Sequence, residues 1–493
     1  MMGIQKSDNS LFCYNVNLNA RLPENHYLKK IDRLLDLDFI RTEVDKHYGE
    51  SGNVSIDPVI IMKLMLLLFL DNISSERELM RMLPYRLDYL WYLGYGLDDK
   101  VPHHSVLSKA RSRWGHDVFK NLFERVVILC CKHGLIDGEK IYMDGSLIEA
   151  NASLNSIESF DPEYEQKVEQ AIFKTIEKLD EKTKDIEFPQ LNKVLKSTTD
   201  PEADVIGHTK NKLRARARYK EHRAVDDQCG VITAVETTPG GISEGKLFSS
   251  LIEQHQLNTD KKVKVAVGDT AYGISDNFLY CSTHNVLGHM ADFNATYHRH
   301  KNIYSPEQFE YDPFTDTYIC PAGEILTFRG YSTEKNKKYK LYKIKPSVCN
   351  KCNLKCKCTT SKCGRKITRI ENHDLIERSR KESHTKEAQR DRKRRSYLME
   401  GSFGDAALNH GFKRSRWRGL IKQYIANYII AAVQNIKKLI SKSGHLRPVI
   451  CKDGLISQKF SIYAIIVDNY VLNKFCSHVQ MYFYDYTLRR NKY

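Results

Sequence analysis

Apolar residues recur at helical spacing over the first quarter of the chain. Between residues 28 and 131 this pattern predicts a package of short helices. Pro58 suits the first turn of a helix that runs to Leu68, and the 74–77 stretch has the residues of a helix cap. Two further helices are predicted over 105–114 and 118–131. The N-terminal region, residues 1–135, is therefore expected to be an all-α domain.

After Gly138 the spacing of apolar residues changes from helical to strand-like. The predicted order is strand, hairpin, helix and strand, at residues 140–143, 221–226 with 230–236, 245–256 and 263–267. This order is typical of a ribonuclease-H-like mixed sheet, so the fold class is α/β. A charged stretch interrupts the core at about 155–200 and is predicted to contain a long amphipathic helix over 162–187.

The remaining chain divides into three parts by composition. A basic, cysteine-bearing insertion is expected, then a helical piece that completes the core, and last an apolar and aromatic tail of unknown role. The expected divisions are 1–135, 136–310, 311–370, 371–441 and 442–493.

The charge of the chain favours a polyanionic partner. Its 493 residues carry 77 Lys+Arg against 61 Asp+Glu, a formal net charge of +16. Such a balance suits nucleic acid, although ribosomal and membrane-surface proteins share it. The first 19 residues are polar, and the apolar run 62–70 is far shorter than the roughly 20 residues that span a bilayer. We expect a cytoplasmic, nucleoid-associated protein without a membrane segment.

Three carboxylates stand where they can converge. Asp144 and Asp269 each end a strand-like run, and Glu400 follows the basic run 390–395 at helical spacing. Three such acids can hold two divalent ions, Mg²⁺ or Mn²⁺, for phosphodiester chemistry. Taken singly, each aspartate also fits a cap or turn, and Glu400 also fits a surface salt bridge.

Thirteen cysteines in a chain without a secretory signal favour reduced thiols or metal ligands over a disulfide framework. Five of them fall between residues 349 and 363. Their spacing predicts a structural Zn²⁺ site, or alternatively a cluster of reduced thiols in a loop-rich segment. The predicted ligands are Cys349, Cys352 and Cys356 with either Cys358 or Cys363, and Cys320 as a possible further ligand.

The 378–422 stretch holds fourteen Lys/Arg against five Asp/Glu and brackets Glu400. Its basic residues are candidates for phosphate contact. Trp417 stands among them and either stacks on an unpaired base or packs in the core. The candidate DNA-binding residues are Arg394, Arg395, Lys413, Arg414, Arg416, Trp417 and Arg418.

Several motifs together resemble one known family. They are Asp57-Pro58 leading to 74–79, Met143-Asp144-Gly145-Ser146 with 150–153, Gly268-Asp269 with 270–273, and 397–404 followed by 410–419. The chain resembles bacterial insertion-sequence transposases of the DDE class, in the group with an InsH-like helical N-terminal domain. Ser396 stands where relatives often have Arg, which leaves Arg394, Arg395 or Lys413 as its substitutes.

The resemblance implies a DNA transposase. Such an enzyme would bind terminal inverted repeats, hydrolyse a phosphodiester with the help of two metal ions and join the 3'-hydroxyl to target DNA. Pairing of two element ends implies a homodimer on double-stranded DNA. The alternatives are a metal-dependent nuclease without strand transfer and a domesticated, non-catalytic DNA-binding protein.

Overall fold

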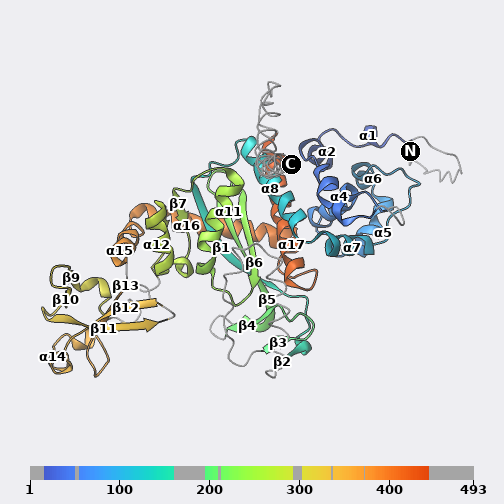
Figure 1. The fold of residues 1–493 in the computed structure, drawn as a ribbon. Helices are drawn as coiled ribbons and strands as arrows, with labels where there is room; N and C mark the ends of the chain where they lie inside the picture. Colours follow the sequence, from blue (N-terminus) through green and yellow to red (C-terminus); the bar gives the residue numbers. More distant parts are fainter. Residues whose placement is uncertain are drawn as a thin grey trace, which may run out of the picture. The chain divides into compact units, whose positions relative to one another are not determined.

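The computed structural model describes residues 16–49, 55–159, 195–208, 213–292, 303–334, 337–370 and 372–443 (Figure 1). Contacts divide the chain after Ser441, and the description below concerns the first unit. The helix predicted over 162–187 and the tail after residue 443 lie outside the described residues.

The N-terminal region is helical, as the apolar spacing predicted. Helix α4 (Pro58–Leu70) begins at the proline, and Asp57 caps it by accepting the backbone N–H of Val59 at 2.8 Å. Ser75 caps α5 in the same way through the N–H of Glu78. The other helices here are α1 (Leu18–Arg21), α2 (Tyr27–Leu34), α3 (Phe39–Val44), α5 (Glu76–Met82), α6 (Leu87–Leu93), α7 (Ser105–Trp114) and α8 (Asp117–Lys132).

An eight-stranded mixed sheet forms the centre of the unit. Its strand order is β2-β3-β4-β5-β1-β7-β8, and β6 pairs with β5. Strand β1 pairs antiparallel with β5 and parallel with β7. The strands are β1 (Lys140–Glu149), β2 (Ile157–Ser159), β3 (Leu195–Ser197), β4 (Asp204–His208), β5 (Leu213–Asp226), β6 (Ile232–Pro239), β7 (Val265–Val267) and β8 (Leu287–His289).

Both faces of the sheet are buried, because successive side chains of β1 enter different cores. Ile141 and Met143 pack with α11 (Phe248–Thr259) and α12 (Ser275–His284). Tyr142 packs into the other core, which also contains residues of the N-terminal helices and of α17. The hairpin predicted around Asp227-Gln228 is present, and the Asp226 carboxylate accepts the backbone N–H of Gly138 at 2.8 Å.

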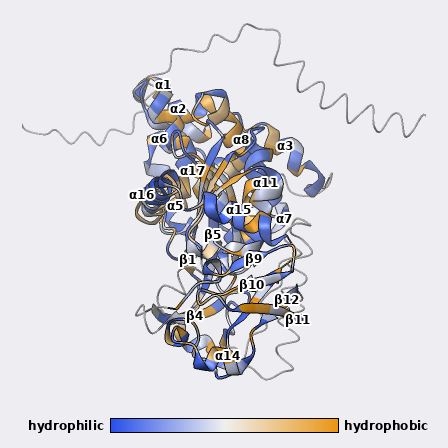
Figure 2. Cartoon of the chain, turned by 90° about the vertical axis from the view of Figure 1, so that its left-hand side faces the viewer, coloured by the Kyte–Doolittle hydropathy of each residue, from blue (hydrophilic) through white to orange (hydrophobic). Residues whose placement is uncertain are grey.

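Three helices end the described chain: α15 (His373–Glu382), α16 (Lys386–Asn409) and α17 (Leu420–Ser443). Most of α17 is buried, and Figure 2 shows hydrophobic residues gathered around it. Among the described helices, none is both long and apolar enough to cross a membrane.

A second sheet of five strands, in the order β13-β12-β11-β10-β9, carries the cysteine-rich segment (Figure 1). The sequence pattern did not predict these strands. They are β9 (Glu310–Asp312), β10 (Thr317–Ile319), β11 (Ile325–Glu334), β12 (Lys337–Lys343) and β13 (Lys366–Ile370), with the short helix α14 (Pro346–Lys351) between the last two. The core of this sheet is small and contains only eight fully buried apolar residues among those described.

Candidate metal centre and adjoining groove

Strand register brings Asp144 and Asp269 together. In the parallel pair of β1 and β7, Tyr142 lies opposite Val267. Each aspartate stands two residues further along its own strand, so both carboxylates reach the same edge of the sheet. Asp269 follows the end of β7 and caps the short turn η5 (Thr270–Tyr272) by accepting the N–H of Ala271 at 2.8 Å.

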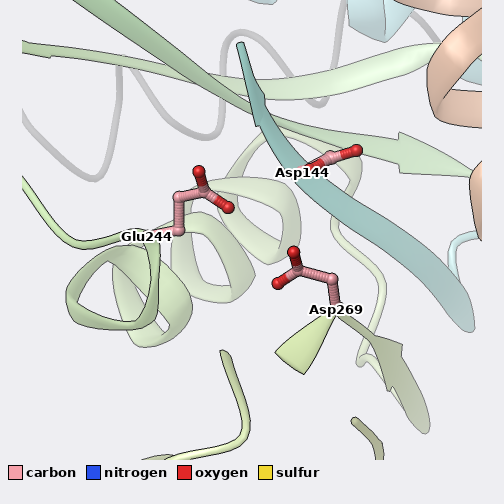
Figure 3. A group of neighbouring side chains, drawn as sticks. All are labelled: Asp144, Glu244 and Asp269. Atoms are coloured by element: carbon pink, nitrogen blue, oxygen red, sulfur yellow. The ribbon is translucent and has the colours of Figure 1, made fainter. Parts of the chain in front are cut away.

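Glu244 is the third acid of this cluster (Figure 3). It begins the short turn η4 (Glu244–Leu247), which lies between β6 and α11. One carboxylate oxygen from each of Asp144, Glu244 and Asp269 lies within 4.8 Å of the other two. A Cβ atom on Gly145 would stand 2.9 Å from Cδ of Glu244, so the absence of a side chain there is what lets the glutamate approach β1.

Burial and mutual repulsion make these carboxylates costly to ionise. Burial raises the pKa of Asp144, and Asp269 raises it further, while Arg395 opposes the shift. The pKa of Glu244 is likewise raised by burial and by both aspartates, against the opposing effect of Lys220. The Arg395 guanidinium lies 2.7 Å from Oδ2 of Asp144, and Nζ of Lys220 lies 3.4 Å from Oε1 of Glu244. Two side-chain cations therefore offset part of the negative charge.

The donor set fits a hard divalent cation, which takes oxygen ligands and favours closely spaced carboxylates. A second observation supports this fit. The Tyr272 hydroxyl is fully buried beside the three acids, with which it interacts electrostatically, and it has no hydrogen-bond partner among the described residues. An ion bound here with its water molecules would give this buried hydroxyl a hydrogen-bond partner.

A groove of about 650 Å³ opens beside the acids. Gly145 and Glu244 belong to its wall, so the groove is continuous with the cluster. The segment that starts at Lys413 closes one side, because the N–H of Glu149 donates to the Lys413 carbonyl at 2.9 Å. The basic residues that line the groove are Arg218, Lys220, Lys413 and Arg414.

Two family models match the chain. One, described as a transposase domain (DUF772), matches residues 16–113 and covers α1 to α7. The other, described as a transposase DDE domain, matches residues 319–440, from the second sheet to α17. Together these two matches support an insertion-sequence DDE transposase. A search of curated proteins gave no match.

The structure does not place Glu400 in the acidic cluster, where it was expected from the sequence. Glu400 lies exposed on α16, and its Oε1 accepts a hydrogen bond from Ser396 at 2.8 Å. The side chain of α16 that reaches the acids is Arg395. Five residues along a helix correspond to a rotation of about 140°, so the two positions cannot face the same site. Among the described residues, Glu244 takes the third place.

Sequence reasoning missed Glu244 because it directly precedes a predicted helix. An acid at that position is ordinarily explained as a favourable charge at a helix N-terminus. The available signal was the Gly240-Gly241 pair directly after β6, together with Gly145 next to Asp144.

Four of the candidate DNA-binding residues are exposed, and they fall into two groups. Lys413 and Arg414 line the groove, and Nζ of Lys413 donates to Ser146 at 3.0 Å. Arg394 is exposed and pairs with Asp227, and Arg418 is exposed and donates to the carbonyl of Asn151.

Arg416 and Trp417 instead join the C-terminal segment to the N-terminal helices. Arg416 donates to the carbonyl of Ile73, and the Trp417 indole N–H donates to Glu76 at 3.1 Å. The guanidinium of Arg111 lies 3.8 Å from the centre of the Trp417 ring. Trp417 is partly buried against the core shared with the N-terminal helices, which agrees with the core role that the sequence left open.

The ten described cysteines are free thiols. Of the predicted zinc ligands, Cys356 and Cys363 are exposed, whereas Cys349 and Cys358 are buried and Cys352 is half-buried. Cys320, from the turn after β10, lines the same cavity as Cys349, Cys352 and Cys358.

Proposed function

We propose that this chain catalyses metal-dependent cleavage and strand transfer at the ends of an insertion sequence, on a ribonuclease-H-like core. The observation that carries the proposal is the meeting of Asp144, Glu244 and Asp269 beside a basic groove, whose wall includes Glu244. A carboxylate cluster alone would fit many metal sites. Its position beside four cationic side chains favours a phosphodiester as substrate.

Asp144, Asp269 and Glu244 would hold Mg²⁺ or Mn²⁺, and bound ions of this kind activate water or a 3'-hydroxyl and stabilise the departing oxygen. Arg395 would hold the Asp144 carboxylate ionised and in place until a metal binds. Because its guanidinium occupies one oxygen of Asp144, this ion pair must loosen for that oxygen to become a ligand.

The groove residues would bind and orient the DNA backbone. Lys413 and Arg414 are exposed, come from one short segment and can contact successive phosphates without reading base sequence. Lys220 lies closer to the acids, where it would stand next to the reacting phosphate. Pairing of two element ends would require a homodimer on double-stranded DNA.

Glu400 takes part in this proposal only through α16. It would become a metal ligand if the helix turned to replace Arg395 at the acids, and the proposal gives the third ligand position to Glu244. If DNA binding turned α16 so that Glu400 took the place of Arg395 at the acids, DNA binding would also complete the second ion site.

The test is a strand-joining reaction with donor-end DNA, a target plasmid and Mg²⁺ or Mn²⁺. Joined products from wild type, and none from Asp269→Asn, are expected. Cleavage without joining would make the chain a nuclease. DNA binding with no cleavage in either metal would make it a non-catalytic DNA-binding protein, and either result would overturn the proposal.

A further inference from the structure

The second sheet has too little core to be held by apolar packing alone. Its buried apolar cluster contains Cys349 and Cys358 among only eight residues. Folds of this size with so small a core ordinarily need a disulfide or a metal to be stable. The described cysteines are all free, so no disulfide performs this role.

Four cysteines from three separate segments border one cavity in this sheet. Cys320 follows β10, Cys349 lies in α14, Cys352 ends that helix, and Cys358 follows the short turn η7 (Lys355–Lys357). The cavity has a volume of about 20 Å³, which is room for a single water-sized body. The Cys358 thiol lies within electrostatic reach of the other three.

Two of these sulfur atoms already accept backbone hydrogen bonds. The N–H of Glu324 donates to Sγ of Cys320 at 3.3 Å, and the N–H of Leu354 donates to Sγ of Cys352 at 3.4 Å. The first turn closes through Gly323, whose φ of 81° lies in the left-handed region that glycine tolerates. Two backbone N–H groups are therefore aimed at cysteine sulfur atoms that border the cavity.

A half-buried cation, Arg365, lies next to the thiols. Arg365 donates to the Cys358 carbonyl at 2.9 Å and to the Tyr304 carbonyl at 3.0 Å, and its buried Nε has no hydrogen-bond partner among the described residues. Burial of an arginine is costly without a counter-charge. Four thiolates around a divalent ion carry a net charge of about −2, which is the counter-charge missing here.

We infer that Cys320, Cys349, Cys352 and Cys358 bind a structural zinc ion that holds the second sheet together. The acidic cluster is the one group of described residues in which three ligand atoms lie within 4.8 Å, so the four sulfur atoms border the cavity at wider spacing. Zinc would draw them to about 2.3 Å from the ion. This set differs from the one expected from spacing. Cys320 takes the place of the exposed Cys356, and Cys358 rather than the exposed Cys363 is the fourth ligand.

The experiment measures metal content in the full-length chain. Wild type purified without added chelator should contain about one zinc per chain, and Co²⁺ substitution should give the strong thiolate-to-cobalt absorption of a sulfur-rich site. Cys320→Ser and Cys352→Ser are the test variants, because these half-buried residues disturb packing less than the buried pair. Each should lose nearly all of its zinc on dialysis.

Cys356→Ser and Cys363→Ser are the matched controls, since they lie in the same segment with exposed thiols. Both should keep wild-type zinc content and cobalt absorption. Asp269→Asn should also keep its zinc, which separates this site from the carboxylate cluster.

Absence of zinc from wild type, with no cobalt–thiolate absorption after reconstitution, would overturn the inference. So would loss of zinc from Cys356→Ser together with its retention in Cys320→Ser. Neither result bears on strand transfer, because the carboxylate cluster does not include these thiols.

Discussion

The carboxylate cluster and the cysteine cavity position their polar ligands in different ways. The acids sit on a sheet buried on both faces, where the register of β1 and β7 fixes two of them before any ion arrives. The four cysteines come from turns and a short helix over a small core. The first region is a preformed site that a metal uses, and the second is a fold that a metal completes. The comparison suggests a rule for these proposed sites. Where the apolar core is large, the fold positions the ligands without the metal, and where the core is small, the metal is needed to hold the fold.

The largest expected effect comes from Asp269→Asn. The amide keeps the size of the side chain but removes a charged ligand, so strand cleavage should fall by at least about 10³-fold. The fold should be unaffected, because the change also relieves repulsion among three acids. Single-turnover cleavage of labelled donor DNA measures the rate. A large fall in melting temperature would show instead that the aspartate is structural.

The next largest effect is expected from replacing each of two glutamates by glutamine. Glu244→Gln should weaken Mg²⁺ or Mn²⁺ binding by about 10- to 100-fold, whereas Glu400→Gln should change it much less in the absence of DNA. Calorimetric titration with Mn²⁺ gives both affinities. The reverse order would mean that α16 turns its glutamate toward the aspartates in solution.

Removal of zinc should act on the second sheet alone. Chelation should expose residues 303–370 to protease while the residues around β1 remain protected, because only the small core depends on the ion. Limited proteolysis followed by mass spectrometry locates the cuts. Equal protection with and without chelator would mean that the eight buried residues suffice.

Divalent metal binding should depend on pH in one direction. Asp144 and Glu244 have pKa values raised above their ordinary 3.8 and 4.5, so protons compete with the metal at a higher pH than usual. Affinity should fall as pH decreases through these raised values, by about tenfold per unit for each proton displaced.

The metal-free chain should show the opposite trend. Ionisation of two buried carboxyls costs stability, so stability should be lost as pH rises through the raised pKa values. Thermal melts with and without Mn²⁺ across this range check both trends. If Glu244→Gln leaves the dependence of melting temperature on pH unchanged, Glu244 does not contribute to these two trends.

The smallest effect expected is that of Lys413→Ala on DNA binding. Loss of one phosphate contact should weaken binding alike for all sequences and reduce the salt slope by about 0.9. Lys264→Ala is the control, because this exposed lysine precedes β7 at the end away from the acids. Fluorescence anisotropy across a salt series separates the two variants, and equal slopes would place the DNA elsewhere.

Much of the fold followed from the sequence where local pattern and tertiary structure agree. Helices α4, α7 and α8 are close to their predicted bounds, because caps, a proline and the spacing of apolar residues specify them locally. The turn of the β5–β6 hairpin is where it was predicted, but β5 begins at Leu213, eight residues before the predicted strand. Asp144 and Asp269 were predictable from their strand-like runs. Asp269 follows the end of β7, whereas Asp144 lies within β1, which continues to Glu149 beyond the predicted end at residue 143. The second sheet was harder to recognise, because β9 and β10 have only three residues each and β12 has four lysines among its seven residues.

The third acid could not be predicted in this way. Glu244 joins the site through a turn between β6 and α11, and its approach depends on Gly145, one hundred residues earlier. Helical spacing favoured Glu400, but the rotation of α16 that places Arg395 on Asp144 is set by packing of that helix against the sheet. Which face of a helix is turned toward a site depends on how the helix packs against the rest of the fold, and the sequence of the helix alone does not specify this.

The joining of Trp417 and Arg416 to α4 and α5 has a consequence for shortened gene copies. Residues from the first helices and from α17 enter one common core, so neither matched region can bury its apolar surface without the other. A product that lacks either the first helices or α17 would expose that surface and aggregate. Deletion derivatives of this kind should therefore yield no folded competitor for DNA ends.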